Sequence, residues 1–277
     1  MIKKYIKSFV SIVKKFLLKE QYPSYFSHAS YVESLCFYSR KNKDWYPPLL
    51  INAEFVRKKL FDTKYVHEAS KLLERLEPDE YTKYLSEYYE EGLQRFGGDW
   101  IYADIVTTLL CLSEIIKPNN YLEIGVRRGR SAAAVALKSV NCKMEFFDIW
   151  MENYAGMDNP GPEFVTRELS KIGHKGVKNF HNGNSHITLK DFLMKDKSLF
   201  DLITVDGDHS YAGATEDLCD VLPRLKIGGA IVFDDINHPK HPYLRDVWRK
   251  LIQNDSRYTS CEIEDLGYGI AFAIRKW

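Results

Sequence analysis

The chain has 277 residues, of which 45% are hydrophobic and 28% charged, and such a length fits one large domain or a domain with an accessory region. This composition excludes a largely disordered chain, a collagen-like protein and a multispan membrane protein. The formal net charge is +1, so we expect no nucleic-acid partner. The five cysteines are odd in number and form no C-x-x-C pair. We therefore expect a reducing, cytoplasmic location without a disulfide framework or a thiolate zinc site.

The first 20 residues differ from the average of the chain. They contain six lysines and one acid, and their apolar residues recur at spacings of three and four from Ile2 to Phe16. This pattern predicts a basic amphipathic helix. Such a helix can lie on an anionic membrane surface, on its own protein or on a second copy of it. We therefore keep two expectations open, a peripheral contact with the inner face of the membrane and a homo-oligomer.

Residues 21–98 lack a motif that indicates a function. Prolines break residues 21–60 into short segments, and a helical pattern returns from about Val66 and continues to Lys117, with Gly97-Gly98 interrupting it. We interpret residues 1–98 as an α-helical accessory region and residues 99–277 as the main domain.

After Pro118, short β-rich runs alternate with helical patterns, which predicts a mostly parallel sheet with helices on both faces. The last two runs are joined by only three residues, so they form a closing antiparallel hairpin. The sequence therefore predicts an α/β fold with a Rossmann-like, seven-stranded, mostly parallel sheet, preceded by an α-helical N-terminal region. The seven predicted strands are residues 121–125, 144–149, 177–183, 200–207, 229–235, 258–265 and 269–276.

The first predicted strand ends in a glycine-containing turn. Gly125 and Gly129 permit a close approach to a ligand, and Glu123 could hold a cationic amino group. Asp148 ends the next strand, where an acid can accept hydrogen bonds from both hydroxyls of a ribose. The alternative is an ordinary turn with a capping carboxylate. The dinucleotide motif G-x-G-x-x-G is not satisfied, because Arg127 occupies its middle glycine position.

Three acids end the fourth and fifth predicted strands: Asp206, Asp234 and Asp235. Adjacent strands lie about 4.8 Å apart, so these carboxylates can converge, and they would repel one another without a compensating cation. An all-oxygen set favours Mg²⁺ or Mn²⁺ over zinc. The alternative is that one of the paired acids caps the following turn.

These motifs resemble those of class I S-adenosylmethionine-dependent methyltransferases. The segment DLITVDGDHSYAGATEDLCDVLPRLKIGGAIVFDD further resembles the macrocin O-methyltransferase type, which acts on sugars and macrolides, and the likeness covers about residues 97–277. The resemblance implies that one set of residues surrounds the methionine part of the cofactor: Glu123, Gly125, Gly129 and Ser131. It further implies that Asp148 binds the ribose and that Asn184 and Ser185 lie near the adenine, although many relatives have Asp in place of Asn184.

The resemblance favours Asp208 as the catalytic base, with His209 as a neighbour, ligand or substitute. We therefore expect a metal-dependent O-methyltransferase acting on a hydroxyl of a sugar or glycosylated molecule. Two other classes are kept open, a nicotinamide-dependent oxidoreductase and a noncatalytic cofactor-binding or scaffold protein. The glycine- and proline-containing segment 150–164 follows the second strand, and we expect it to be a mobile lid over the acceptor.

Overall fold

Residues 51–277 form one compact unit, of which the computed structural model describes residues 51–264 and 267–277. The predicted basic helix at residues 1–20 lies outside the described residues, so its contact with a membrane or with a second copy of the chain stays a prediction. Within the described part of the chain, no helix is long and apolar enough to cross a membrane.

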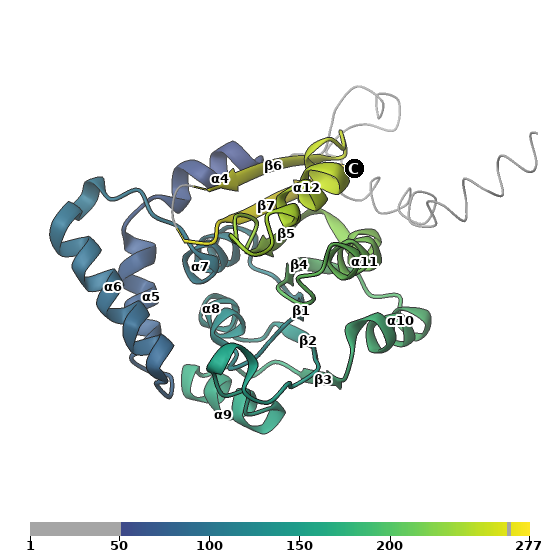
Figure 1. Ribbon diagram of the computed structural model, residues 1–277, viewed down its shortest axis with the longest axis horizontal. Coiled ribbons are helices and arrows are strands. Elements are labelled where there is room, and N and C mark those ends of the chain that lie inside the picture. Colours follow the sequence, from purple (N-terminus) through teal and green to yellow (C-terminus); the bar gives the residue numbers. More distant parts are fainter. Residues whose placement is uncertain (1–50, 265–266) are drawn as a thin grey trace, which may run out of the picture. The chain divides into compact units, whose positions relative to one another are not determined.

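A seven-stranded sheet with the order β3-β2-β1-β4-β5-β7-β6 forms the centre of this unit (Figure 1). Strands β1 to β5 are parallel to one another, whereas β7 is antiparallel to both β5 and β6. The predicted Rossmann-like sheet with a closing antiparallel hairpin is thus confirmed. The strands are β1 Asn120–Ile124, β2 Lys143–Asp148, β3 Lys178–Asn182, β4 Phe200–Val205, β5 Leu225–Asp234, β6 Tyr258–Ile263 and β7 Ile270–Arg275.

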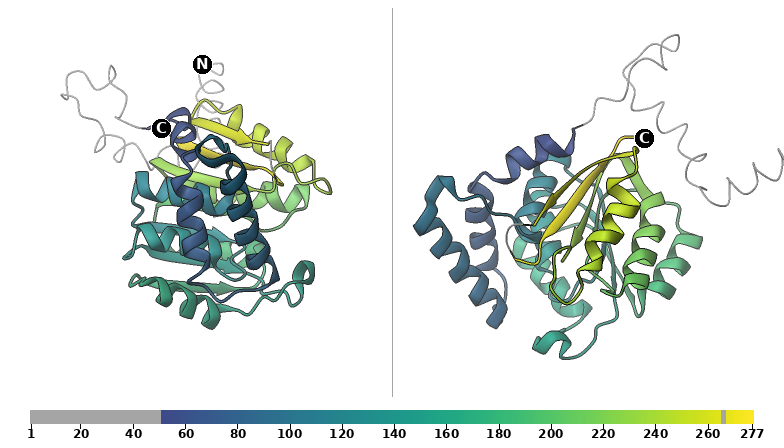
Figure 2. Two further views of the ribbon diagram at one scale, coloured as in Figure 1. Left: turned by 90° about the vertical axis from the view of Figure 1, so that its left-hand side faces the viewer. Right: turned by 45° about the horizontal axis from the view of Figure 1, so that its top comes forward.

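Nine α-helices surround this sheet in the described residues. Helices α7, α8 and α9 pack side by side on one face, and α10, α11 and α12 on the other (Figures 1 and 2). Helices α4 and α5 pack against α7, and α6 packs against α5. The helices are α4 Ala53–Leu60, α5 Lys64–Leu73, α6 Glu80–Phe96, α7 Ile105–Ile116, α8 Arg130–Lys138, α9 Pro162–Ile172, α10 Ser185–Lys195, α11 Tyr211–Val221 and α12 Tyr243–Trp248.

Alternation along the strands separates two hydrophobic cores, one on each face of the sheet. Leu202 and Val232 belong to the core beneath α4–α9, whereas their neighbours Ile203 and Ile231 belong to the core beneath α10–α12. These side chains are completely buried. Because both faces are covered, the central strands are apolar at nearly every position, which explains why their sequences are such clear strand signals.

The helices before the sheet share the first core. Ala53, Leu72 and Tyr89 from α4, α5 and α6 are buried together with residues of α7 and α8. Helix α7 begins at a capping box in which Asp104 accepts a hydrogen bond from the backbone N–H of Thr107. An N-terminal helical region is therefore present over residues 51–98, while the boundary at residue 98 stays a prediction.

The register of the parallel strands brings their carboxyl ends to one level. Ile124 is paired with Phe147 of β2 and with Val205 of β4, and Val205 is paired with Phe233 of β5. The next residue on each strand therefore lies at the same edge of the sheet. These residues are Gly125, Asp148, Asp206 and Asp234.

Candidate active site

The turn after β1 requires glycine at position 125. Gly125 has φ +86°, and a Cβ atom there would lie 1.8 Å from the carbonyl oxygen of Asp206. A side chain at this position would therefore push apart the ends of β1 and β4. Arg127, two residues later, also has a positive φ, at 50°, which is uncommon for a residue with a side chain.

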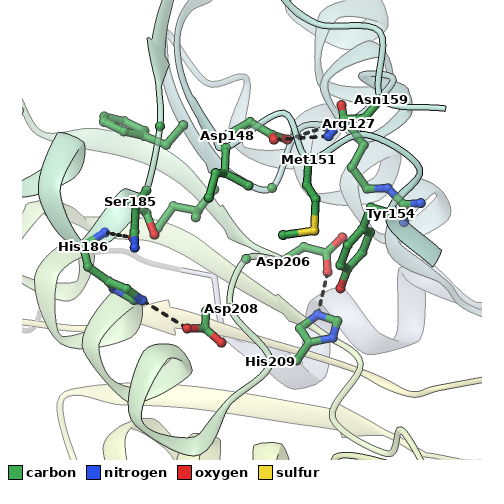
Figure 3. A pocket seen from close by; sticks show the side chains of 17 residues that line it. Arg127, Asp148, Met151, Tyr154, Asn159, Ser185, His186, Asp206, Asp208 and His209 are labelled. Carbon is green, nitrogen blue, oxygen red and sulfur yellow. Dashed lines mark hydrogen bonds and ion pairs between the residues drawn. The ribbon is translucent and has the colours of Figure 1, made fainter. Parts of the chain in front are cut away.

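Asp148 at the end of β2 holds this turn in place. Its Oδ2 accepts a hydrogen bond from the backbone N–H of Arg127 at 2.8 Å (Figure 3). Oδ2 also accepts one from the N–H of Val126 at 2.8 Å, and Oδ1 accepts one from the N–H of Trp150 at 2.6 Å. The carboxylate is nearly buried. The capping function that the sequence left as an alternative is thus present, and the predicted contact with a ribose stays a prediction.

Glu123 lies beneath the same turn and is completely buried. One carboxylate oxygen accepts a hydrogen bond from the hydroxyl of Ser131, and the other, Oε2, has no hydrogen-bond partner among the described residues. Burial raises the pKa of Glu123 to about 8, although the hydrogen bond from Ser131 opposes this shift. Glu123 does not line either cavity described below, so the predicted contact with a cofactor amino group stays a prediction.

A cavity of about 330 Å³ opens at the carboxyl ends of β1, β2 and β4. The loop after β2 extends over it and contributes Met151, Tyr154 and Asn159 (Figure 3). Of the residues predicted to bind the cofactor, the cavity is lined by Gly125, Asp148, Asn184 and Ser185. Gly129 does not line it, and its missing Cβ instead makes room for Val165 of α9.

A buried aspartate on α11 supports the far end of this cavity. Asp217 is completely buried and accepts a hydrogen bond from the hydroxyl of Ser185 at 2.8 Å, while its second oxygen lies 3.4 Å from the backbone N–H of Asp208. Burial raises the pKa of Asp217 to about 6. Asn184 caps α10 by accepting a hydrogen bond from the backbone N–H of His186. Asp217 was not among the predicted site residues, because an acid within a helical run carries no sequence signal for such a contact.

Asp234 and Asp235 end β5 in an unusual environment. Asp235 has φ 60°, a conformation that favours glycine and is typically found at functional sites. Burial and the charge of Asp206 raise the pKa of Asp235 to about 7, while His209 and Arg127 partly offset the shift. Burial and both neighbouring aspartates also raise the pKa of Asp234 well above its usual value. Asp148, by contrast, accepts three hydrogen bonds from backbone N–H groups, which stabilise its negative charge.

The structure brings Asp206, His209 and Asp235 together. The Nε2 atom of His209 lies 3.3 Å from Oδ1 of Asp206 (Figure 3). The same atom lies 3.7 Å from Oδ2 of Asp235. One potential ligand atom from each residue lies within 4.8 Å of the others. Burial disfavours the charged form of His209, but the bond with Asp206 and the charges of Asp206 and Asp235 outweigh this and raise its pKa.

This group differs from the predicted one by one residue. Asp206 and Asp235 converge as predicted from their positions at the strand ends. His209, predicted as base, ligand or neighbour, takes the third position, whereas Asp234 does not belong to this group of potential ligand atoms. Asp234 is the last residue of β5, whereas Asp235 follows the strand with a left-handed backbone, which brings its carboxylate to Asp206 and His209.

Asp208 does not join this group. Its Oδ1 accepts a hydrogen bond from the backbone N–H of Ser210 at 2.7 Å, and its Oδ2 lies 3.2 Å from Nε2 of His186 (Figure 3). The side chain lines only the first cavity. The geometry therefore does not favour Asp208 as the base, because the turn directs its carboxylate toward His186 and not toward the other acids.

A second cavity, of about 510 Å³, opens in front of β5 and contacts α6 and the turn after β1. Ser131, Asp234 and Asp235 line it, together with Tyr81 of α6. The two cavities share five lining residues: Gly125, Arg127, Tyr154, Asp206 and His209. They therefore meet at the group of potential metal ligands.

Two of the shared residues, Arg127 and Tyr154, were missed by the sequence interpretation. The guanidinium of Arg127 lies over the ring of Tyr154, 5.1 Å from its centroid, which is a favourable arrangement of a cation and an aromatic ring. The only available signal was the position of Arg127 where the dinucleotide motif would have glycine. Tyr154 lies in the predicted lid segment, and no pattern distinguishes it there from the other aromatic residues.

Comparisons with known proteins indicate the family of the domain that contains the sheet. Residues 122–236, from β1 to just beyond β5, match the family model of a methyltransferase domain. These residues form a methyltransferase domain. The predicted resemblance to class I methyltransferases is thereby confirmed, and the match decides against a nicotinamide-dependent oxidoreductase.

Solved structures show the same fold for the methyltransferase domain. The O-methyltransferase TomG from Streptomyces achromogenes, in complex with S-adenosylmethionine, is 19% identical, with 78% of this chain and 97% of that chain covered and a TM-score of 0.52. An O-methyltransferase from Bacillus cereus, in complex with S-adenosylhomocysteine, is 19% identical, with 68% and 90% covered and a TM-score of 0.50. At these identities the likeness concerns the fold alone. No curated protein matches the sequence.

Proposed function

We propose that this methyltransferase uses S-adenosylmethionine and a divalent cation to methylate a hydroxyl of a sugar or glycosylated molecule. The observation that carries the proposal is the meeting of two cavities at Asp206 and His209. A methyl transfer requires two substrates whose reacting atoms come into contact while the rest of each molecule is bound separately. The two cavities offer such an arrangement.

The first cavity suits the cofactor. It lies at the carboxyl ends of parallel strands, where α/β sheets bind their ligands, and it is next to the turn that Asp148 stabilises. The similar structures of TomG and the Bacillus cereus protein contain S-adenosylmethionine and S-adenosylhomocysteine, respectively, which supports the same ligand class here.

The residues at the meeting point fit a divalent cation. Asp206 and Asp235 contribute hard oxygen ligands, which suit Mg²⁺ or Mn²⁺, and we assign the imidazole of His209 beside them to proton transfer and not to the metal. The raised pKa values of Asp234 and Asp235 indicate negative charge that the described residues do not compensate. A bound cation would compensate this charge and make a nearby hydroxyl more acidic.

His209 is the best-placed proton acceptor for the reaction. Its ring lines both cavities, and Asp206 and Asp235 stabilise the imidazolium that forms when it takes a proton. In the proposed step the acceptor oxygen forms a bond to the methyl carbon as the carbon–sulfur bond breaks. The hydroxyl proton passes to His209, and the sulfur keeps the bonding electron pair.

The acceptor class follows from the second cavity and from the resemblance in the segment at 201–235. The cavity is large enough for a glycosyl unit, and both charged and aromatic side chains line it, among them Tyr81, Asp104 and Arg130. Sugars carry hydroxyl groups on an apolar ring, so polar and aromatic residues together suit them. A noncatalytic scaffold is the competing interpretation, and the group at the meeting point argues against it because its acids are costly to retain without a ligand.

The proposal is tested by incubating the full chain with radiolabelled S-adenosylmethionine and Mg²⁺ against a panel of glycosides and surface-polysaccharide precursors. Label transfer to a glycoside that is abolished by a chelator and restored by Mg²⁺ is the expected result. Transfer that persists unchanged in the chelator would exclude the metal. Failure of S-adenosylhomocysteine to bind in a calorimetric titration would exclude the function as a whole.

A further inference from the structure

The loop after β5 presents basic side chains to the second cavity. His238, Lys240 and His241 line it from this loop, and Arg127 lines it from the turn after β1. None of these four residues is explained by methyl transfer itself. Their placement on the acceptor side therefore raises the question of which chemical group they bind.

Two cations of this cavity have no acidic partner in the described part of the chain. Arg128 and Arg130 also line the cavity, but both pair with Asp79, at 3.3 and 3.1 Å. By contrast, the guanidinium of Arg127 lies near the sulfur of Met157 and over the ring of Tyr154, and no ion pair within 4.0 Å joins Arg127 or Lys240 to a carboxylate of the described residues. These two charges remain available to a ligand.

The loop holds its imidazoles in fixed positions. Nδ1 of His238 accepts a hydrogen bond from the backbone N–H of Lys240 at 3.0 Å, so in the neutral ring the proton is on Nε2, which is then a donor. The His238 ring also packs on Tyr268, with centroids 4.2 Å apart. Nδ1 of His241 lies 2.9 Å from the hydroxyl of Tyr243. Donors that are held in this way bind a ligand without a large ordering cost.

The loop places the His238 ring close to two other imidazoles. The centroid of the His238 ring lies 4.8 Å from that of His241 and 6.4 Å from that of His209. The loop backbone is ordered by two successive turns, in which the N–H of His238 binds the carbonyl of Asp235 at 3.0 Å and the N–H of His241 binds that of His238 at 2.9 Å. The loop thus presents a cationic side chain and imidazole groups to the cavity from an ordered backbone, which is the chemistry of an anion site.

We propose that the acceptor carries an anionic group, a phosphate or a carboxylate, which binds to Lys240 and His238 while Arg127 adds positive charge from the turn after β1. This inference rests on the proposed function and narrows its substrate class. Of the two cavities, His238 and Lys240 line only the second, whereas the meeting point lies at Asp206 and His209, so the anionic group lies apart from the hydroxyl that is methylated. The acceptor is therefore a sugar phosphate, a phosphate-linked saccharide or a saccharide with an acidic sugar.

Calorimetric titration of the full chain with three related probes tests this inference. Glucose 1-phosphate carries a phosphate, glucuronate carries a carboxylate, and glucose carries neither. We expect at least one anionic probe to bind about tenfold or more tightly than glucose, because charge-assisted hydrogen bonds are the stronger kind. Preference for the phosphate or for the carboxylate then identifies the source of the anion.

Two variants and a matched control locate the site. Lys240→Gln removes the charge at similar length, and His238→Asn keeps an acceptor near the backbone but loses the distal N–H. Each should weaken the anionic probe about tenfold. Lys250→Gln alters an exposed lysine that does not line the cavity, and it should leave affinity unchanged. Equal affinity of Lys240→Gln and the unmodified chain for the anionic probes would overturn the inference.

S-adenosylhomocysteine is titrated in parallel to separate the two proposals. If it binds while neither anionic probe is preferred over glucose, the anion site is wrong and the methyl transfer proposal stands. If it does not bind, the proposed function is wrong, whatever the anionic probes do.

Discussion

Two strands of the sheet end in aspartates with opposite environments. Asp148 at the end of β2 accepts three backbone N–H groups within 2.8 Å. Asp235, just after β5, has a left-handed backbone, a pKa raised to about 7 by burial and by Asp206, and only His209 as a nearby basic partner within 4 Å among the described residues. A carboxylate with all its bonds made stabilises the fold, whereas one that lacks compensation can bind a ligand.

The same contrast separates two neighbours in the segment after β4. Asp208 accepts a hydrogen bond from the backbone N–H of Ser210 and contacts His186, so both oxygens of its carboxylate have partners within the protein. His209 faces the two acids at the meeting point of the cavities. The turn therefore directs the Asp208 side chain toward groups of the protein and the His209 side chain toward the acids at the meeting point.

The largest effect on activity is expected from substitution of His209, compared with substitution of its neighbour Asp208. His209→Gln should lower kcat about 10²–10⁴-fold, which is the usual scale for loss of a positioned proton acceptor. Asp208→Asn keeps the turn and should lower kcat by less than about threefold, since removal of a side chain outside the reacting group has a small effect. Single-turnover methyl transfer with an identified acceptor measures both. A larger loss in Asp208→Asn than in His209→Gln would return the role of base to Asp208.

The two strand-end aspartates should differ in their effect on stability. Asp148→Asn leaves an amide N–H facing backbone donors, so the free energy of unfolding should fall by about 3 kcal/mol. Asp235→Asn removes an uncompensated charge and should change it by less than about 1 kcal/mol. Urea denaturation measures both values. Equal losses in the two variants would show that the contrast between the two strand ends is wrong.

Much of this arrangement could be predicted because parallel strands end at one edge of a sheet. Asp206 and Asp235 follow buried strands, and their convergence follows from topology alone. The hydrogen bonds of Asp148 and the orientation of Asp208 could not be predicted, since each depends on one turn whose backbone angles leave no pattern in the sequence. Arg127 and Tyr154 come together only through the loop after β2, so their contact depends on tertiary structure.

Glu123 is a further acid near the end of a strand, and its complete burial favours the neutral form. Its pKa is raised to about 8 from an ordinary value of 4.5, so between these pH values the folded chain binds a proton that the unfolded chain does not. Stability attributable to Glu123 is therefore complete below about pH 4.5 and is lost as the pH rises toward 8. Glu123→Gln mimics the neutral acid, and it should reduce the loss of unfolding free energy between pH 6 and pH 8 by about 2 kcal/mol. An identical pH dependence in both proteins would contradict the raised pKa.

The smallest effect is expected in the segment 150–164 over the first cavity. Met151, Tyr154 and Asn159 line that cavity but gain their ligand contacts only when it is occupied. Backbone hydrogen exchange in this segment should slow severalfold when S-adenosylhomocysteine is bound, and further when an acceptor is added. Residues of β4, which are already buried, are the internal control. Exchange in the segment that is equally slow with and without ligands would show that it is not a lid.

Our main proposal is that Asp206 and Asp235 hold a cation where the two cavities meet, and Mn²⁺ affinity tests this proposal. Mn²⁺ can be followed by electron paramagnetic resonance in the unmodified chain, in Asp235→Asn and in Asp208→Asn. We expect Asp235→Asn to weaken binding at least about tenfold, because it replaces an anionic ligand with a neutral one. Asp208→Asn should bind within about twofold of the unmodified chain, since its carboxylate lies outside the group. Unchanged affinity in Asp235→Asn, or an equal loss in Asp208→Asn, would contradict the claim.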